Sequence, residues 1–202
     1  MNSGYGKQKG SQFERKICNQ LSLWVSGGKR RDLYWRSAMS GGRATVAYKK
    51  GETLTRQAGD ITATSPEGHA LTDLFYFELK HYKDLQIDSF LIKGVGNLAK
   101  FWRDTVNHAQ KYKRNPVLIA KQNNMPTLVI SQPGTISYFR CPILTQYTRS
   151  PDPPIIIKTE IHLLSEVLKS AFKDRRVLLF GMLPRPIVQP KKTHKRIKLI
   201  RR

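Results

Sequence analysis

Two β-strand candidates decide the fold of this chain: Asp60-Ile61-Thr62-Ala63-Thr64 and Leu74-Phe75-Tyr76-Phe77-Glu78-Leu79-Lys80. The first ends at a Pro- and Gly-containing turn over residues 65–68, and the second is rich in aromatic residues that favour strands. Because side chains alternate between the two faces of a strand, Glu78 and Lys80 project to one side with Tyr76 in line behind them, and the residues between them point to the other side and can be buried. If the two strands are neighbours, Asp60 and Glu78 converge on one point.

Acidic residues are scarce in this chain, so the position of each one is informative. There are 36 Lys and Arg against 14 Asp and Glu, a formal net charge of +22. Mg²⁺ accepts one or two protein carboxylates and leaves its other positions to water and substrate phosphate. A cation bound in this way polarises a phosphoryl oxygen and lowers the pKa of a coordinated water. We therefore predict that Asp60 and Glu78 bind Mg²⁺, with Mn²⁺ as an alternative ion. Lys80 would orient the attacking water or offset charge on phosphorus.

The charge predicts a polyanionic partner, because self-repulsion of this size is usually neutralised by nucleic acid. A membrane surface would call for an amphipathic basic helix or a lipidation signal, and the sequence suggests neither. It also has no apolar run near the ~20 residues of a membrane span, and no apolar signal-peptide core at its start. The expected location is intracellular, cytoplasmic or nucleoid-associated, and not secreted. Cys18 and Cys141 lack the spacing of a zinc module, and Cys18 fits a buried small hydrophobe.

Working outward from the two strands, the chain is expected to form one domain with extensions. Apolar spacing with Ser11 as N-cap predicts a helix over residues 11–25, and a second helix is expected over 97–113. Further strands are expected at 117–120 and 127–130, and this order of elements indicates a mixed α/β sheet flanked by helices. The expected divisions are a flexible basic arm (1–10), a core (11–140) with a basic loop or β-ribbon (29–59), an extension (141–184) and a disordered basic tail (185–202).

The extension is expected to contain a linker between Pro151 and Pro154, a short strand at 155–157, a helix over 159–173 and a last strand at 177–180.

The pattern of Gly59-Asp60, a spacer and Glu78-Leu79-Lys80 resembles the signature of the PD-(D/E)XK nucleases, with Gly in place of its Pro. Three further segments resemble motifs of the archaeal-type Holliday junction resolvases in that superfamily and occur in the same order. They are Gly10-Ser11-Gln12-Phe13-Glu14-Arg15, Arg36-Ser37-Ala38-Met39-Ser40-Gly41-Gly42 and Gln110-Lys111-Tyr112. The resemblance covers about residues 8–130, and the insertion at residues 43–57 is longer than in compact resolvases.

The resemblance implies a restriction-endonuclease-like αβββαβ core and a metal-dependent endodeoxyribonuclease that leaves 5′-phosphate and 3′-hydroxyl ends. For the resolvase branch it implies a homodimer acting on branched DNA. Glu14 would complete the metal site and act in catalysis, and Gln110 would be an accessory residue. Contacts to DNA are expected from the basic loop, through Arg30, Arg31, Arg36, Ser37, Ser40, Arg43, Lys49 and Lys50.

Each site residue also has a structural interpretation. Ser11-x-x-Glu14 fits a capping box, in which Glu14 reaches back to the helix start and needs no metal. Asp60 fits a turn residue that accepts from local amides, and Glu78 and Lys80 fit a simple ion pair. Tyr34, Trp35 and Tyr48 fit either base stacking or packing at the loop base. The alternative functions are a restriction-like or phage-type general endonuclease acting on duplex DNA, and a non-catalytic basic protein that binds nucleic acid.

Overall fold

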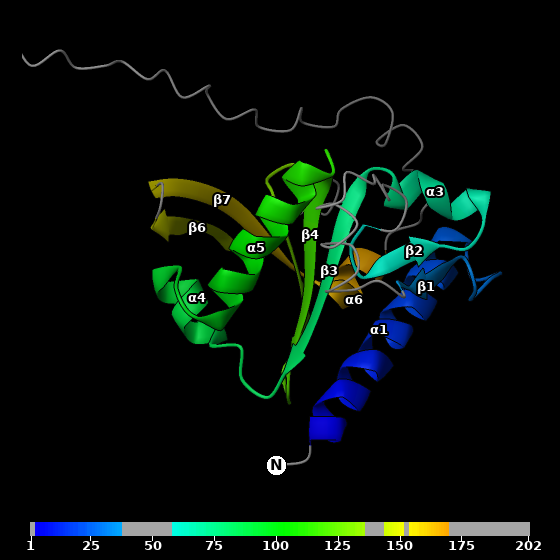
Figure 1. The fold of residues 1–202 in the computed structure, drawn as a ribbon, viewed down its shortest axis with the longest axis horizontal. Helices are drawn as coiled ribbons and strands as arrows, with labels where there is room; N and C mark the ends of the chain where they lie inside the picture. Colours follow the sequence, from blue (N-terminus) through cyan, green and yellow to red (C-terminus); the bar gives the residue numbers. More distant parts are fainter. Residues whose placement is uncertain (1–2, 38–57, 136–143, 152–153, 170–202) are drawn as a thin grey trace, which may run out of the picture.

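A five-stranded mixed sheet forms the centre of the protein (Figure 1). This computed structural model describes residues 3–37, 58–135, 144–151 and 154–169, with side chains described over 8–37, 58–135 and 158–169. The strand order is β3 (Phe75–Tyr82), β4 (Asn115–Gln122), β5 (Thr127–Ser131), β7 (Pro154–Leu163) and β6 (Leu144–Pro151). Only the β3–β4 pair is parallel in this sheet. The predicted α/β class, a mixed sheet flanked by helices in a restriction-endonuclease-like fold, is confirmed.

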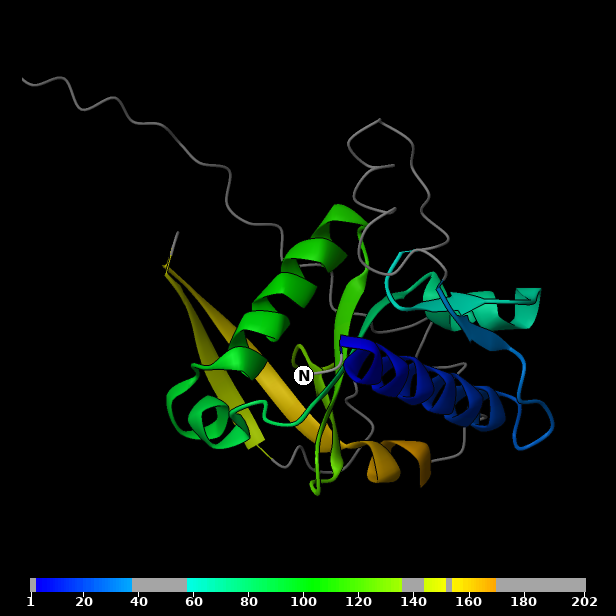
Figure 2. The ribbon, with the colours of Figure 1, turned by 60° about the horizontal axis from the view of Figure 1, so that its bottom comes forward.

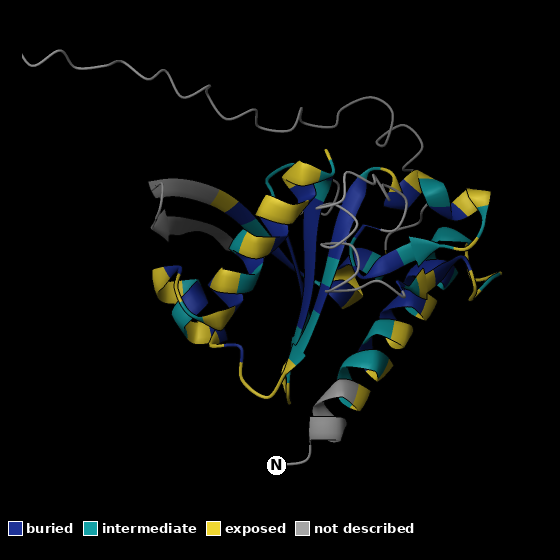
Figure 3. Ribbon diagram, viewed as in Figure 1, coloured by how far each residue is buried: buried dark blue, intermediate teal, exposed yellow. Residues whose placement is uncertain are grey.

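Helices cover both faces of the sheet (Figure 2). One core contains α1 (Ser3–Val25), α6 (Leu164–Lys169) and the odd-numbered side chains of β3, with Ile17 and Phe77 among its members. The other contains α4 (Ile87–Lys93), α5 (Asn97–Lys111) and the even-numbered side chains of β4, with Trp102 fully buried. Figure 3 shows the result, buried central strands between helices whose outer faces are exposed. The predicted alternation along β3 is confirmed, because Phe75, Phe77 and Leu79 are all in the first core.

Helix α1 begins earlier than the sequence predicted. It runs from Ser3, so most of the expected arm over residues 1–10 is helical, and Ser11 lies inside the helix. An N-cap must stand at the first turn, so the prediction of Ser11 as N-cap is wrong and the capping-box interpretation of Glu14 does not apply. Phe13, Ile17 and Leu21 are buried as their helical spacing predicted, and so is Cys18.

A small second sheet lies beside β3. β1 (Tyr34–Arg36) and β2 (Ile61–Ala63) pair antiparallel with each other, so the predicted strand at 60–64 is not a ladder neighbour of β3. This pair forms the base of the predicted basic loop or β-ribbon, whose residues 38–57 lie outside the described part. A turn was predicted at 65–68, but Ser65 is instead the N-cap of α3 (Pro66–Thr72) and residues 66–68 form its first turn, with Pro at a position where its missing N–H costs nothing.

The chain after residue 140 differs most from the sequence-based prediction. Pro151 and Pro154, which flank the expected linker, pair with each other at the ends of β6 and β7, and the expected short strand at 155–157 lies within β7. Of the expected helix over 159–173, residues 159–163 belong to β7, residues 164–169 form the short α6, and residues 170–173 lie outside the described part. Residues 154–161 pair with β6 on one side, and residues 160–163 pair with β5 on the other, so sheet pairing overrides the helical spacing at Ile161, whereas Leu164 begins α6. The expected strand at 177–180 and tail at 185–202 lie outside the described residues.

Candidate active site

Strand β3 lies at one edge of the sheet, and it carries a row of polar side chains on the face covered by α5. Lys80 Nζ lies 2.5 Å from Glu78 Oε1, and the Tyr76 hydroxyl donates to Glu78 Oε2 at 3.3 Å. The side chains of Glu78 and Lys80 are 16% and 24% exposed. The ion pair that the structural interpretation requires is therefore present, but both partners remain open to a ligand from solvent.

Asp60 is joined to this row through the backbone of β3. Its N–H donates to the Phe77 carbonyl at 2.8 Å, and its carboxylate Oδ2 accepts from the Leu79 N–H at 2.7 Å. Leu79 stands between Glu78 and Lys80, so this hydrogen bond places the Asp60 carboxylate beside both. Asp60 is only 6% exposed. The carboxylate is thus bonded to a strand 19 residues away rather than to the amides of its own turn.

Gly59 makes this close approach achievable. Its φ is +88°, and a Cβ added there would lie 2.5 Å from the Phe77 carbonyl oxygen. A side chain at this position would therefore push Asp60 away from β3. Proline, the residue of the superfamily signature, holds φ near −65° and does not fit this backbone. This turn therefore requires Gly at position 59, where the superfamily signature has Pro.

The pKa of Asp60 is set mainly by its burial and then by the charges beside it. Burial raises the pKa of Asp60 to about 7, helped by the charges of Glu78 and Glu14 and opposed by the Leu79 N–H and by Lys80. For Lys80, burial alone would lower the pKa, but Glu78 and Asp60 outweigh it and the net shift is upward. The site therefore holds a protonated lysine beside a carboxyl that titrates near neutral pH.

The raised pKa of Asp60 predicts how the metal-free protein responds to pH. The ordinary value is 3.8, so the protonated carboxyl stabilises the fold at low pH, and this stabilisation is lost as pH rises from about 4 through about 7. We expect Asp60→Asn to gain stability relative to wild type as pH rises from 5 to 8, by on the order of 1 kcal/mol or more. Urea unfolding in EDTA at both pH values measures this difference. Parallel pH profiles for the two proteins would contradict the assignment.

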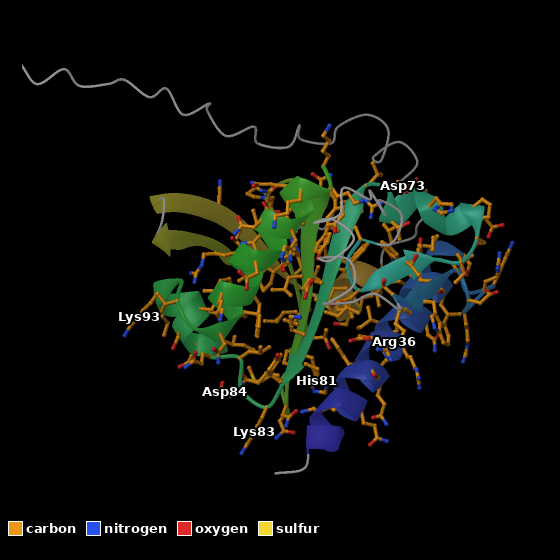
Figure 4. The ribbon with its side chains drawn as sticks, viewed as in Figure 1. Arg36, Asp73, His81, Lys83, Asp84 and Lys93 are labelled. Atoms are coloured by element: carbon orange, nitrogen blue, oxygen red, sulfur yellow. The ribbon has the colours of Figure 1, made fainter. Side chains whose placement is uncertain are left out.

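Glu14 reaches the site region from α1 and is held there by Arg36. Arg36 Nε lies 3.0 Å from Glu14 Oε2, while its Nη1 donates to the Ser11 hydroxyl at 2.8 Å. The buried Oε2 accepts no hydrogen bond from the described residues. Figure 4 shows Arg36 beside α1 and His81 on β3. Within the described ranges, no group of three or more His, Cys, Asp or Glu side chains is placed to hold a metal ion.

Most of the other residues predicted to contact DNA either form contacts within the protein or lie outside the described residues. Arg30 pairs with Asp32 and Glu67 at 2.9 and 3.0 Å. Ser37 is buried, contrary to its expected place in an open loop, because its N–H donates to the Asp60 carbonyl at 2.8 Å. Arg31 is exposed. Ser40, Arg43, Lys49 and Lys50 lie outside the described residues.

Two further sets of predicted residues have mixed outcomes. Gln110 is exposed in the last turn of α5, and no hydrogen bond or ion pair among the described residues joins it to Glu78 or Lys80. Of the aromatic residues proposed for stacking, Tyr34 is fully buried and therefore a packing residue, Trp35 is 52% exposed, and Tyr48 lies outside the described residues.

Helix α5 and its C-cap contribute ring side chains to the site, and the sequence analysis did not predict this contribution. Phe101 lies under the Lys80 ammonium, with 5.5 Å between Nζ and the ring centroid. Further along the helix, His108 and Tyr112 lie 6.0 and 5.8 Å from the Tyr76 ring, measured between centroids. Phe101 and His108 are seven residues apart on α5, and Tyr112, the C-cap of the helix, follows four residues later, so all three lie on one side. Their spacing was the available signal, although spacing alone does not say which strand a helix covers.

A pocket of about 410 Å³ lies elsewhere, between α1, α6 and the ends of β3, β4 and β5. His81 lines it and Glu78 and Lys80 do not. The candidate catalytic residues therefore do not belong to this pocket.

The fold is restriction-endonuclease-like, and it carries Glu14 on α1, Asp60 just before β2 and Glu78-Leu79-Lys80 on the edge strand β3, the order expected of a PD-(D/E)XK nuclease. A family model described as a phage putative PDDEXK endonuclease matches residues 5–138, and the chain belongs to this family. No curated protein and no solved structure matches the chain. Among the described residues, no helix is both long and apolar enough to span a membrane.

Proposed function

We propose that this protein is a Mg²⁺-dependent DNA endonuclease in which Asp60, Glu78 and Lys80 form the catalytic centre and Glu14 assists. The observation that carries the proposal is the hydrogen bond from the Leu79 N–H to Asp60 Oδ2. It brings a second carboxylate to the Glu78–Lys80 pair, in a chain with only 14 acidic residues and 36 basic ones. A purely DNA-binding surface gains nothing from concentrating acids in this way, because they repel phosphate.

The residues present fit a hard divalent cation. Carboxylate oxygens are its preferred ligands, and two protein carboxylates are enough for Mg²⁺. Asp60 and Glu78 would hold it, and the pKa of Asp60, which is raised by burial and by the charge of Glu78, agrees with two carboxyl groups lying close together. Glu14 is the proposed third ligand, and binding there would require its Oε2 to leave the ion pair with Arg36, whose Nε lies 3.0 Å away. Bound there, the cation would polarise a phosphoryl oxygen and lower the pKa of a coordinated water.

The protein groups then have distinct roles. Lys80 is protonated, so it donates hydrogen bonds and stabilises negative charge on the phosphate rather than removing a proton. Glu78 fixes the lysine through their 2.5 Å contact, and Tyr76 fixes Glu78 from behind. Arg36 neutralises Glu14 in this structure and is also a candidate phosphate contact.

The proposed substrate is branched DNA, cut by a homodimer, on the strength of the resolvase-like segments at residues 10–15, 36–42 and 110–112. The family description supports a phage-type endonuclease of broader substrate range as the second candidate.

Cutting of labelled DNA substrates tests both the metal and the substrate. The set is a four-way junction, a flap, a nicked duplex and a linear duplex of shared sequence, each with Mg²⁺, Mn²⁺ or EDTA. We expect cutting in either metal, none in EDTA, and the fastest cutting on a branched substrate. Equal rates on all four substrates would favour the general endonuclease, and cutting in EDTA would overturn the metal assignment.

A further inference from the structure

Tyr82 is an exposed aromatic residue at the end of the catalytic row. It is 46% exposed, against 16% and 24% for the side chains of Glu78 and Lys80. It lies two residues beyond Lys80 on β3 and therefore on the same face of the sheet. The row thus passes from the half-buried Glu78 carboxylate to an exposed aromatic ring.

Phe101 holds this ring next to Lys80. The Tyr82 and Phe101 rings are tilted by 31° with centroids 5.1 Å apart, and the same Phe101 ring lies 5.5 Å from Lys80 Nζ. A two-residue step along a strand is roughly 6.6–6.8 Å, so Tyr82 is about one strand repeat from the lysine.

We propose that Tyr82, supported by Phe101, stacks on an unpaired base of the DNA strand beside the phosphate to be cut. This inference rests on the proposed nuclease function and specifies its substrate. A base inside a duplex has both faces covered by its neighbours, whereas an unpaired base has a face available to an aromatic side chain. The ring would therefore select DNA in which the cut site adjoins a branch, flap or frayed end.

The charges around the ring suit the same ligand. Lys83 follows Tyr82 and Lys100 precedes Phe101, and both lysines are exposed. Cations beside a stacking ring are the usual arrangement for single-stranded nucleic acid, where they follow the phosphates while the ring takes the base. One acid lies in the same loop, where Asp84 Oδ1 accepts from the Gln86 N–H at 2.8 Å, and it keeps its negative charge. Figure 4 shows Lys83 and Asp84 in the loop that follows β3.

Two substrates of one sequence test the proposal, a duplex with a single-stranded flap at the cut site and the same duplex fully paired. We expect Tyr82→Ala to lower kcat/KM on the flap substrate by roughly 5- to 150-fold, the range for losing one base–aromatic stack. The change on the paired duplex should be under about 2-fold by the same argument. Tyr82→Phe keeps the ring and should behave as wild type. Ile92→Ala, at a residue that is 77% exposed on α4, is the matched surface control.

A binding measurement separates this inference from the proposed function. A 2-aminopurine placed as the unpaired base should be quenched by wild type and by Tyr82→Phe in EDTA, and not by Tyr82→Ala. Cutting by wild type without such quenching, or equal losses of Tyr82→Ala on both substrates, would overturn the inference and leave the nuclease standing. Quenching without cutting by wild type would support the stacking and overturn the proposed function.

Discussion

Asp60→Asn and Glu78→Gln are expected to stop DNA cutting while leaving DNA binding as strong as in wild type or stronger. Each change removes one negative charge from a site that has to attract both a cation and a phosphate. Without either carboxylate the cation is held weakly or in the wrong place, and its contribution to activating water is lost. We expect cutting to fall by about 10³-fold or more. Binding should be retained because the removed charge repels DNA.

The measurement is single-turnover cutting of a labelled four-way junction in Mg²⁺, beside binding of the same DNA in EDTA. Glu67→Gln is the matched control, because it makes the same charge change at an exposed residue of α3 and should cut normally. Full cutting by both site variants would refute the catalytic assignment. Loss of the fold in both would instead favour the interpretation of Glu78 and Lys80 as a structural ion pair.

Side-chain alternation was enough to predict one half of this site from sequence. Glu78 and Lys80 share a face and contact each other, and Phe77 and Leu79 are buried on the opposite face, as a period of two requires. This part is local, since two residues on one strand keep their relation whatever the rest of the chain does. The mixed α/β class could be predicted for the same reason, from the periods of individual segments.

The other half depends on contacts between distant segments, which local patterns do not encode. Asp60 was expected to pair with β3 through a strand ladder, and instead reaches Leu79 with its side chain. Glu14 had a capping interpretation that disappears only because α1 begins at Ser3. Phe101 lies at the site because α5 packs over β3, which is a contact between separate elements of the fold. The error after residue 140 has the same origin, because β7 is a strand only by virtue of its partners.

Gly59 leads to a prediction that runs against the family signature, because restoring the signature Pro should harm the protein. The φ of +88° is costly for any L residue, and a Cβ would meet the Phe77 carbonyl oxygen at 2.5 Å. We expect Gly59→Ala to lower the free energy of unfolding by roughly 1–3 kcal/mol. Gly59→Pro should lower it by at least as much, because the proline ring cannot adopt positive φ. Displacing Asp60 by about 1 Å should also reduce cutting by about 10²-fold.

Gly28→Ala supplies the control for backbone strain. Gly28 has a φ of +87°, nearly the same as Gly59, but a Cβ there would meet nothing within 4 Å. Both alanine variants should therefore lose stability from the strained backbone, while only Gly59→Ala should lose cutting beyond what its unfolding explains. Urea unfolding and single-turnover cutting at a temperature where every variant is folded measure the two effects. Normal cutting by Gly59→Pro would show that the position of Asp60 does not depend on this turn, and that the carboxylate reaches the site in another way.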